Sequence, residues 1–69
     1  NVLVKLKGRR SVRGKIKGFD KQMNIVITEA IEMIEQPNNN HNPEKAQYQE
    51  SQVGDALIRG DNVITIAVL

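Results

Sequence analysis

Alternating apolar and polar positions mark two strands at the start of the chain. Residues 2–7 alternate, a polar turn follows at residues 8–11, and residues 12–19 alternate again. A period of two is typical of a strand with one buried face, so both segments are predicted as β-strands. The positions expected to point inward in the first strand are Val2, Val4 and Leu6.

The second predicted strand carries two glycines on the face expected to be buried. That face comprises Val12, Gly14, Ile16 and Gly18. Glycine removes side chains where a sheet bends sharply or where another backbone comes close, so we expect a strongly curved small barrel. The outer face of the two strands then carries Lys5, Lys7, Arg13, Lys15 and Lys17.

The next segment begins as a strand and then becomes ambiguous. Residues 25–28 are mostly β-branched, which favours a strand. In residues 29–35, glutamates recur at every third position with apolar residues between them, which also suits an amphipathic helix. The alternative is a continued strand with an irregularity near Glu29 and Ala30. The pattern alone leaves both open.

A polar loop separates this segment from the second half of the chain. Residues 37–43 have proline at both ends and asparagines between, and we place a variable loop between the third and fourth strands at residues 36–45. His41 lies in this loop without converging partners, so no ligand or catalytic role is expected for it. Extended structure resumes at residues 47–58. Its expected buried positions are Val53, Leu57 and Ile58, with a possible kink at Gly54.

The last predicted strand, residues 62–69, is apolar on both faces. A half-buried strand should alternate, and an open apolar edge strand tends to pair with another chain. Coverage of both faces within the monomer is the alternative, but so small a chain has little material for it. We therefore expect burial against a neighbouring subunit.

Composition narrows the class of protein. The 69 residues predict a single domain over 1–69, near the lower size limit for independent folding. The absence of cysteine excludes a disulfide framework and a thiolate zinc site, and a single histidine cannot form a metal site unaided. No segment resembles a membrane span or a secretory signal, so a soluble intracellular protein without cofactor or membrane partner is expected. The sequence opens at Asn1 rather than methionine, which is compatible with a missing upstream piece.

Charge is divided unevenly along the chain. Residues 1–21 hold eight lysines and arginines against one acid, a net +7, whereas residues 22–69 hold two bases against seven acids, a net −5. A dense basic segment suggests contact with a polyanion, although a merely solvated face is the alternative interpretation.

Two ordered motifs carry a family resemblance. The first is Gly14-x-Ile16-x-Gly18-Phe19-Asp20-x-x-Met23-Asn24, followed by residues 25–27 and Ala30, and the second is Leu57-Ile58-Arg59-Gly60-Asp61-Asn62-Val63. They resemble the two Sm motifs of the Sm and LSm proteins, and the second resembles the archaeal and eukaryotic form rather than the bacterial one. With their strands they cover nearly the whole chain except the asparagine-rich loop.

The resemblance implies a fold and an assembly. The fold is all-β: a strongly bent five-stranded antiparallel sheet forming a small open barrel, usually preceded by a short helix, with residues 25–34 as a strand. The implied assembly is a ring, a hexamer or heptamer, in which the fourth strand of one subunit pairs with the fifth of the next. Such rings bind uridine-rich single-stranded RNA at the pore, in RNA processing or as RNA chaperones. The cytoplasm is the expected compartment for a prokaryotic source, and the nucleus is the alternative for a eukaryotic one.

The resemblance also implies an RNA-binding set: Asp20, Gln22, Met23, Asn24, Arg59, Gly60 and Asp61. The Asn24 carboxamide offers a donor and an acceptor to a base edge, and the flat Arg59 guanidinium can stack on a base. Asp20 and Asp61 are expected to hold these two side chains, and Gly60 to permit a close approach of the backbone. Gln22 departs from the family, which usually has an aromatic residue or histidine there. We expect weaker binding or a relaxed uridine preference, with Lys21 compensating in part through phosphate.

Each of these residues also has a structural interpretation. Asp20 and Asn24 can simply satisfy turn backbone, and Arg59 with Asp61 can form a subunit-contact ion pair. Phe19 and Met23 are predicted to lie in the core.

Two other function classes were weighed. A ring-shaped protein-interaction scaffold with weak or no RNA binding is the alternative function. An enzyme is disfavoured because the chain has no cysteine, no second histidine and no nucleophile with a base beside it.

Overall fold

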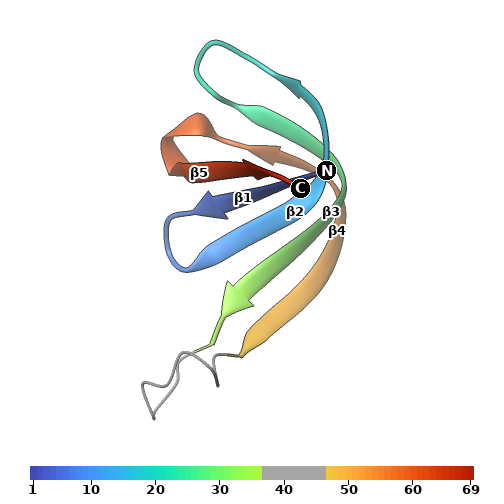
Figure 1. Cartoon of the computed structure of the whole chain (residues 1–69), viewed down its shortest axis with the longest axis vertical. Coiled ribbons are helices and arrows are strands. Elements are labelled where there is room, and N and C mark those ends of the chain that lie inside the picture. The colour runs from blue at the N-terminus through green and yellow to red at the C-terminus, as the bar shows by residue number, and fades with distance from the viewer. Residues whose placement is uncertain (37–46) are drawn as a thin grey trace.

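The chain folds into one bent antiparallel sheet of five strands (Figure 1). The computed structural model describes residues 1–36 and 47–69. The strands are β1 (Val2–Leu6), β2 (Arg10–Phe19), β3 (Ile25–Glu35), β4 (Tyr48–Ile58) and β5 (Val63–Val68). Their order in the sheet is β4-β3-β2-β1-β5, so β4 and β5 form its two edges. The predicted all-β open barrel is confirmed.

The chain ends lie together at one side of the sheet, where the Leu69 amide donates to the Asn1 carbonyl at 2.9 Å (Figure 1). The predicted variable loop at 36–45, including His41, lies outside the described residues except for Gln36. No helix in the described part of the chain is long and apolar enough to cross a membrane.

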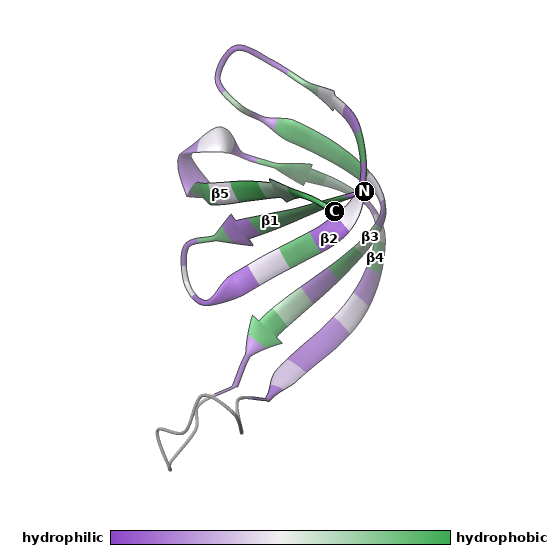
Figure 2. Cartoon of the chain, viewed as in Figure 1, coloured by the Kyte–Doolittle hydropathy of each residue, from purple (hydrophilic) through white to green (hydrophobic). Residues whose placement is uncertain are grey.

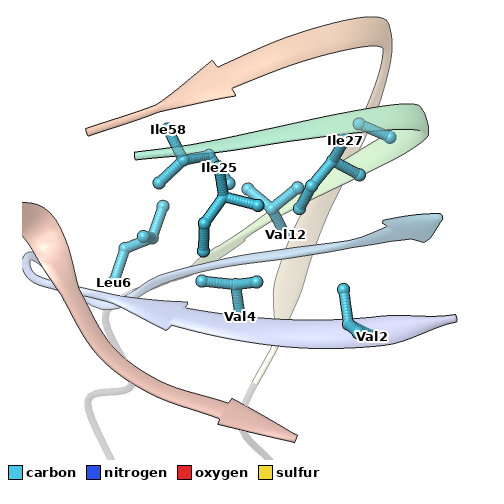
Figure 3. Packing of buried hydrophobic residues seen from close by; sticks show 8 residues of the cluster. Val2, Val4, Leu6, Val12, Ile25, Ile27 and Ile58 are labelled. Carbon is cyan, nitrogen blue, oxygen red and sulfur yellow. The ribbon is translucent and has the colours of Figure 1, made fainter. Parts of the chain in front are cut away.

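The core lies on the concave side of the sheet (Figure 3). It combines the inward positions of β1 with side chains from β2, β3 and the end of β4: Val2, Val4, Leu6, Val12, Ile25, Ile27, Ala30 and Ile58. The prediction for the first strand is confirmed, as is Ile58. The prediction for Val53 and Leu57 is wrong for this chain, because both side chains are exposed and Leu57 retains 72% of its accessible surface.

The third strand resolves the ambiguity between strand and helix. β3 is continuous from Ile25 to Glu35, and its irregularity falls at Glu29 and Ala30, where the pairing with β4 shifts and Glu29 adopts φ 52°. β4 carries the matching break at Gly54, which has φ 84° and lies opposite Ala30. The expected kink at Gly54 is therefore confirmed. Pairing with β2 and β4 on both sides outweighs the local helical pattern of the glutamates.

The glycines of β2 have different surroundings. A Cβ on Gly14 would collide with the Ile27 side chain and lie 2.8 Å from the Thr28 carbonyl oxygen, so a close backbone approach occurs there, as expected. A Cβ on Gly18 would meet nothing within 4 Å. Two register shifts in β2 also break the alternation predicted for residues 12–19: Val12 and Gly14 are buried, but Ile16 is exposed.

Hydropathy differs between the two edge strands (Figure 2). β5 is hydrophobic along most of its length, whereas the half of β4 next to the grey trace is mainly polar. The outward lysines and arginine of β1 and β2 are exposed as predicted. Lys15 is partly neutralised by Glu29, whose carboxylate lies 3.2 Å from Lys15 Nζ.

Candidate nucleic-acid interface

The turn between β2 and β3 is organised around the side chain of Asp20. Asp20 Oδ1 accepts hydrogen bonds from the amides of Gln22 at 3.0 Å and Asn24 at 2.9 Å. The backbone closes the same turn, because the Met23 amide donates to the Asp20 carbonyl and the Asp20 amide donates to the Asn24 carbonyl, both at 3.1 Å. An aspartate is well suited to this position because its short carboxylate reaches amides two to four residues onward.

Met23 lies in the left-handed region of backbone conformation, with φ 66°. A non-glycine residue there costs roughly 1 to 3 kcal/mol and persists only where the surroundings require it. The hydrogen bonds to Asp20 on both sides of Met23 supply that requirement. The result is a turn with a fixed shape from which the side chains of Gln22 and Met23 project into solvent.

Asn24 joins this turn to the second one, at Arg59–Asp61. Its Nδ2 donates to Asp20 Oδ2 at 2.9 Å, and its Oδ1 accepts from the Gly60 amide at 2.8 Å. Two residues 36 positions apart in sequence are thus in direct contact. A carboxamide has two N–H groups and two acceptor lone pairs, so one of each stays available to a ligand. Asn24 therefore has a structural task as well as a capacity to read a base edge.

Gly60 is packed directly on the first turn. A Cβ at this position would collide with the Gln22 carbonyl oxygen and lie 2.9 Å from the Met23 carbonyl carbon. Only glycine fits without a shift of one turn against the other, because the obstructing atoms belong to the backbone. The close approach expected at Gly60 is present, and the contacting surface is the Gln22–Met23 peptide.

The second turn holds its charged side chains in solvent. It forms the short 3-10 helix η2 (Gly60–Asn62), preceded by Arg59 in an extended conformation. Arg59 Nη2 lies 3.2 Å from Asp61 Oδ2, and the two side chains are 76% and 63% exposed. An ion pair so exposed contributes little to stability, and the guanidinium plane remains accessible for stacking.

The carboxyl group of Asp20 is the group in this site with a shifted pKa. The hydrogen bond from the Asn24 side chain is the largest cause that lowers the pKa of Asp20, and the Asn24 and Gln22 amides lower it further. These donors favour the ionised form because a carboxylate accepts hydrogen bonds that a protonated acid accepts less well. Asp20 is thus held as an anion, which suits a residue that positions Asn24 and not one that touches phosphate.

The structure brings the sequence-predicted set together on two touching turns. The two aspartates contact the side chains they were expected to hold, through Asp20 with Asn24 and Asp61 with Arg59. The purely structural interpretation of Asp20 and Asn24 also describes contacts that are present. Arg59 and Asp61 pair within one chain, so a partner subunit is not required for that contact.

The prediction that Phe19 and Met23 lie in the core is wrong for this chain. Phe19 retains 77% of its accessible surface and Met23 retains 51%. Phe19 is the last residue of β2, and the positive φ of Met23 directs its backbone out of the sheet. Sequence reasoning missed that the two belong to an apolar hollow beside the turn. The available signal was a pair of large apolar residues flanking a polar turn.

Comparison with known proteins follows from this geometry. A bent five-stranded barrel with two touching polar turns is the architecture of the Sm-type proteins. The Sm protein of Pyrococcus abyssii, solved in complex with a uridine heptamer, has a TM-score of 0.70 and 30% identity, over 96% of this chain and 78% of that one. The Sm-like protein of Methanococcus vannielii has a TM-score of 0.69 and 26% identity, over 99% of this chain and 78% of that one.

The sequence comparisons agree with the structural ones. The model of the LSM domain matches residues 1–68, and the chain belongs to this family. It is 38% identical over 66 residues to a protein described as snRNP Sm-like from Methanosarcina barkeri, covering 96% of this chain and 76% of that one. It is 35% identical over 68 residues to small nuclear ribonucleoprotein G of Schizosaccharomyces pombe, covering 99% and 74%. The resemblance drawn from the two motifs is confirmed.

Proposed function

We propose that this chain assembles edge to edge into a closed ring and binds single-stranded, uridine-rich RNA at the joined turns of Asp20–Asn24 and Arg59–Asp61. The observation that carries the proposal is the Asn24 bridge, which fixes Gln22 and Arg59 beside each other across a turn-to-turn contact. The uridine heptamer bound by the related Pyrococcus protein supports it.

The edges of the sheet support the ring. β4 and β5 are both unpaired on their outer sides within the described chain, and each carries large exposed apolar residues. These are Val53 and Leu57 on β4, and Ile64 and Val68 on β5. Pairing of β4 with β5 of the next copy satisfies both edges and covers these side chains. Because the two surfaces differ, the contact is head to tail, and it closes into a ring when the rotation between copies permits. Six or seven subunits are proposed, as the family resemblance implies.

The two turns support RNA binding through complementary groups. Arg59 offers a flat cation for stacking on a base, and Asn24 keeps one donor and one acceptor. Stacking of a base on a flat side chain contributes roughly 1 to 3 kcal/mol. Sites repeated around a ring would add avidity without new contacts. The basic residues of β1 and β2 provide a long-range attraction for the phosphates.

Native mass spectrometry with and without a short oligouridine tests both parts of the proposal. A closed ring that gains the oligomer, and loses it in Arg59→Ala, supports ring and site together. Lys17→Ala is the matched control, since it removes an exposed cation remote from both turns. A ring that ignores the oligomer would favour the scaffold function, for which the replacement of a ring side chain by Gln22 is the specific observation. A monomer would contradict the proposed assembly.

A further inference from the structure

An apolar hollow lies beside the first turn and is open in the single chain. It has a volume of about 230 Å³ and is lined by Ile16, Phe19, Met23, Ile25 and Ile66. Ile25 belongs to the core, and Ile66 pairs in register with fully buried Val4, so the hollow is a continuation of the core. Phe19 and Met23 form its exposed rim.

The hollow is built largely from residues of the candidate RNA site. Phe19 directly precedes Asp20, Met23 belongs to the turn, and Ile25 directly follows Asn24. Whatever fills the hollow therefore packs against the turn that carries Gln22 and Asn24. A turn with a left-handed residue at Met23 depends on its surroundings, so contacts on this side are expected to hold its shape.

The remaining wall of the hollow comes from an edge strand. Ile66 lies on β5, whose outer edge is unpaired within the described chain. A strand added to this edge would present alternate side chains to the concave side of the sheet, directly over the hollow. The occupant must therefore come from an extended segment with an apolar side chain available at that level.

The β4 strand of a second copy meets these requirements. Ala56 and Ile58 are packed in the core of their own chain, so Leu57, between them, points away from it and is 72% exposed. When β4 pairs with β5 of the next copy, its own core cannot release Ala56 and Ile58. Leu57 is then the large apolar side chain free to face the neighbour's concave side.

We propose that Leu57 of one copy fills the hollow formed by Ile16, Phe19, Met23, Ile25 and Ile66 of the next. This inference rests on the proposed function, and it makes ring closure a condition for a fully ordered RNA site. By linkage, RNA bound at the turn stabilises the ring by the same factor that the ring strengthens RNA binding.

Site-directed cross-linking tests the contact without RNA. The chain has no cysteine, so single variants Phe19→Cys and Leu57→Cys, co-expressed with different tags, can cross-link only between copies. A short bismaleimide should give a mixed-tag dimer in the pair and only background in either variant alone. Tyr48→Cys replaces Leu57→Cys as the matched control. It is also exposed on β4, but it lies nine residues away, roughly 30 Å along an extended strand.

The outcomes separate this inference from the proposed function. Assembled protein in which Phe19→Cys cross-links equally to both β4 positions, or to neither, overturns the Leu57 contact while ring and RNA binding stand. Protein that stays monomeric overturns the ring itself. The linkage has its own test, because Leu57→Ala should raise the concentration at which the ring dissociates by at least about tenfold, and oligouridine should lower that concentration in the unmodified protein. No shift with bound oligouridine overturns the linkage.

Discussion

The two turns of the candidate site are held by different means. The first, at Asp20–Asn24, is fixed by a network of hydrogen bonds centred on one carboxylate, whereas the second, at Arg59–Asp61, presents its charged side chains on an exposed ion pair. Asn24 and Gly60 are the points where they meet. The difference teaches that shape in this site comes from the first turn and that the adjustable stacking group comes from the second. Substitutions at the meeting points should therefore damage folding, and substitutions at Arg59 should damage binding alone.

Gly60→Ala should have the largest effect on stability. The new methyl group collides with the backbone of Gln22, so the turns must move apart and the Asn24 bond to the Gly60 amide must stretch or break. Overpacking of this kind costs roughly 1 to 3 kcal/mol in the free energy of unfolding, which thermal or urea denaturation measures. Gly18→Ala is the control, since its Cβ meets nothing within 4 Å. Equal stability of the two variants would contradict the packing of the second turn on the first.

Asn24→Ala should weaken both folding and RNA binding. It leaves the part-buried Gly60 amide and one Asp20 oxygen without their partner, at a cost of roughly 1 to 3 kcal/mol. Denaturation and oligouridine titration measure the two losses on the same protein. Asn62→Ala serves as a control, because Asn62 contributes its backbone to the contact with Lys7. Loss of binding with unchanged stability would mean that Asn24 acts only on the ligand.

Arg59→Ala should change binding without changing folding. Its ion pair with Asp61 is solvent-exposed, so stability should stay within about 0.5 kcal/mol of the parent. Oligouridine affinity should fall by roughly 1 to 3 kcal/mol through loss of stacking. Arg59→Lys keeps the charge and removes the flat guanidinium, so it separates stacking from phosphate attraction. Full affinity in Arg59→Lys would show that only the charge matters.

Gln22→Tyr and Gln22→His should tighten oligouridine binding by about 1 kcal/mol, because a ring at this exposed position can stack on a base. Competition between oligouridine and oligoadenosine measures the change and shows whether base preference sharpens with it. Gln22→Leu is apolar but not planar and controls for added hydrophobic surface. If the tyrosine variant binds no better than the leucine variant, Gln22 lies away from the base.

Acid should loosen the first turn before the second. Because hydrogen bonds from Asn24 and Gln22 lower the pKa of Asp20 below 3.8, the contribution of Asp20 is complete above its unfolded value. That contribution is lost as pH falls through the lower, folded-state value. Chemical shifts of the Gln22 and Asn24 amides, followed by NMR between pH 5 and about 2, should report this titration, and it should vanish in Asp20→Asn. This is the smallest effect, because the group is exposed. Titration of these amides above pH 4 would contradict the lowered pKa.

The sequence by itself determined the strands, the bend and the two turns. Alternation, β-branched residues and the glycines of the first motif require only local sterics and the removal of apolar surface from water, which act within a few residues. The pairing of Asp20 with Asn24 and of Arg59 with Asp61 was accessible for the same reason, since each joins residues close in sequence.

Tertiary structure alone decided the contacts between distant segments. The bond from Gly60 to Asn24 spans 36 positions, and no local pattern specifies which turn meets which. The helical pattern at 29–35 became a strand because neighbours on both sides pair with it. Phe19, Met23 and Leu57 have core-like hydropathy, but their exposure depends on where the bent sheet ends and which edges it leaves open. Burial is a property of the whole arrangement, so it could be assigned only after the strands were in place.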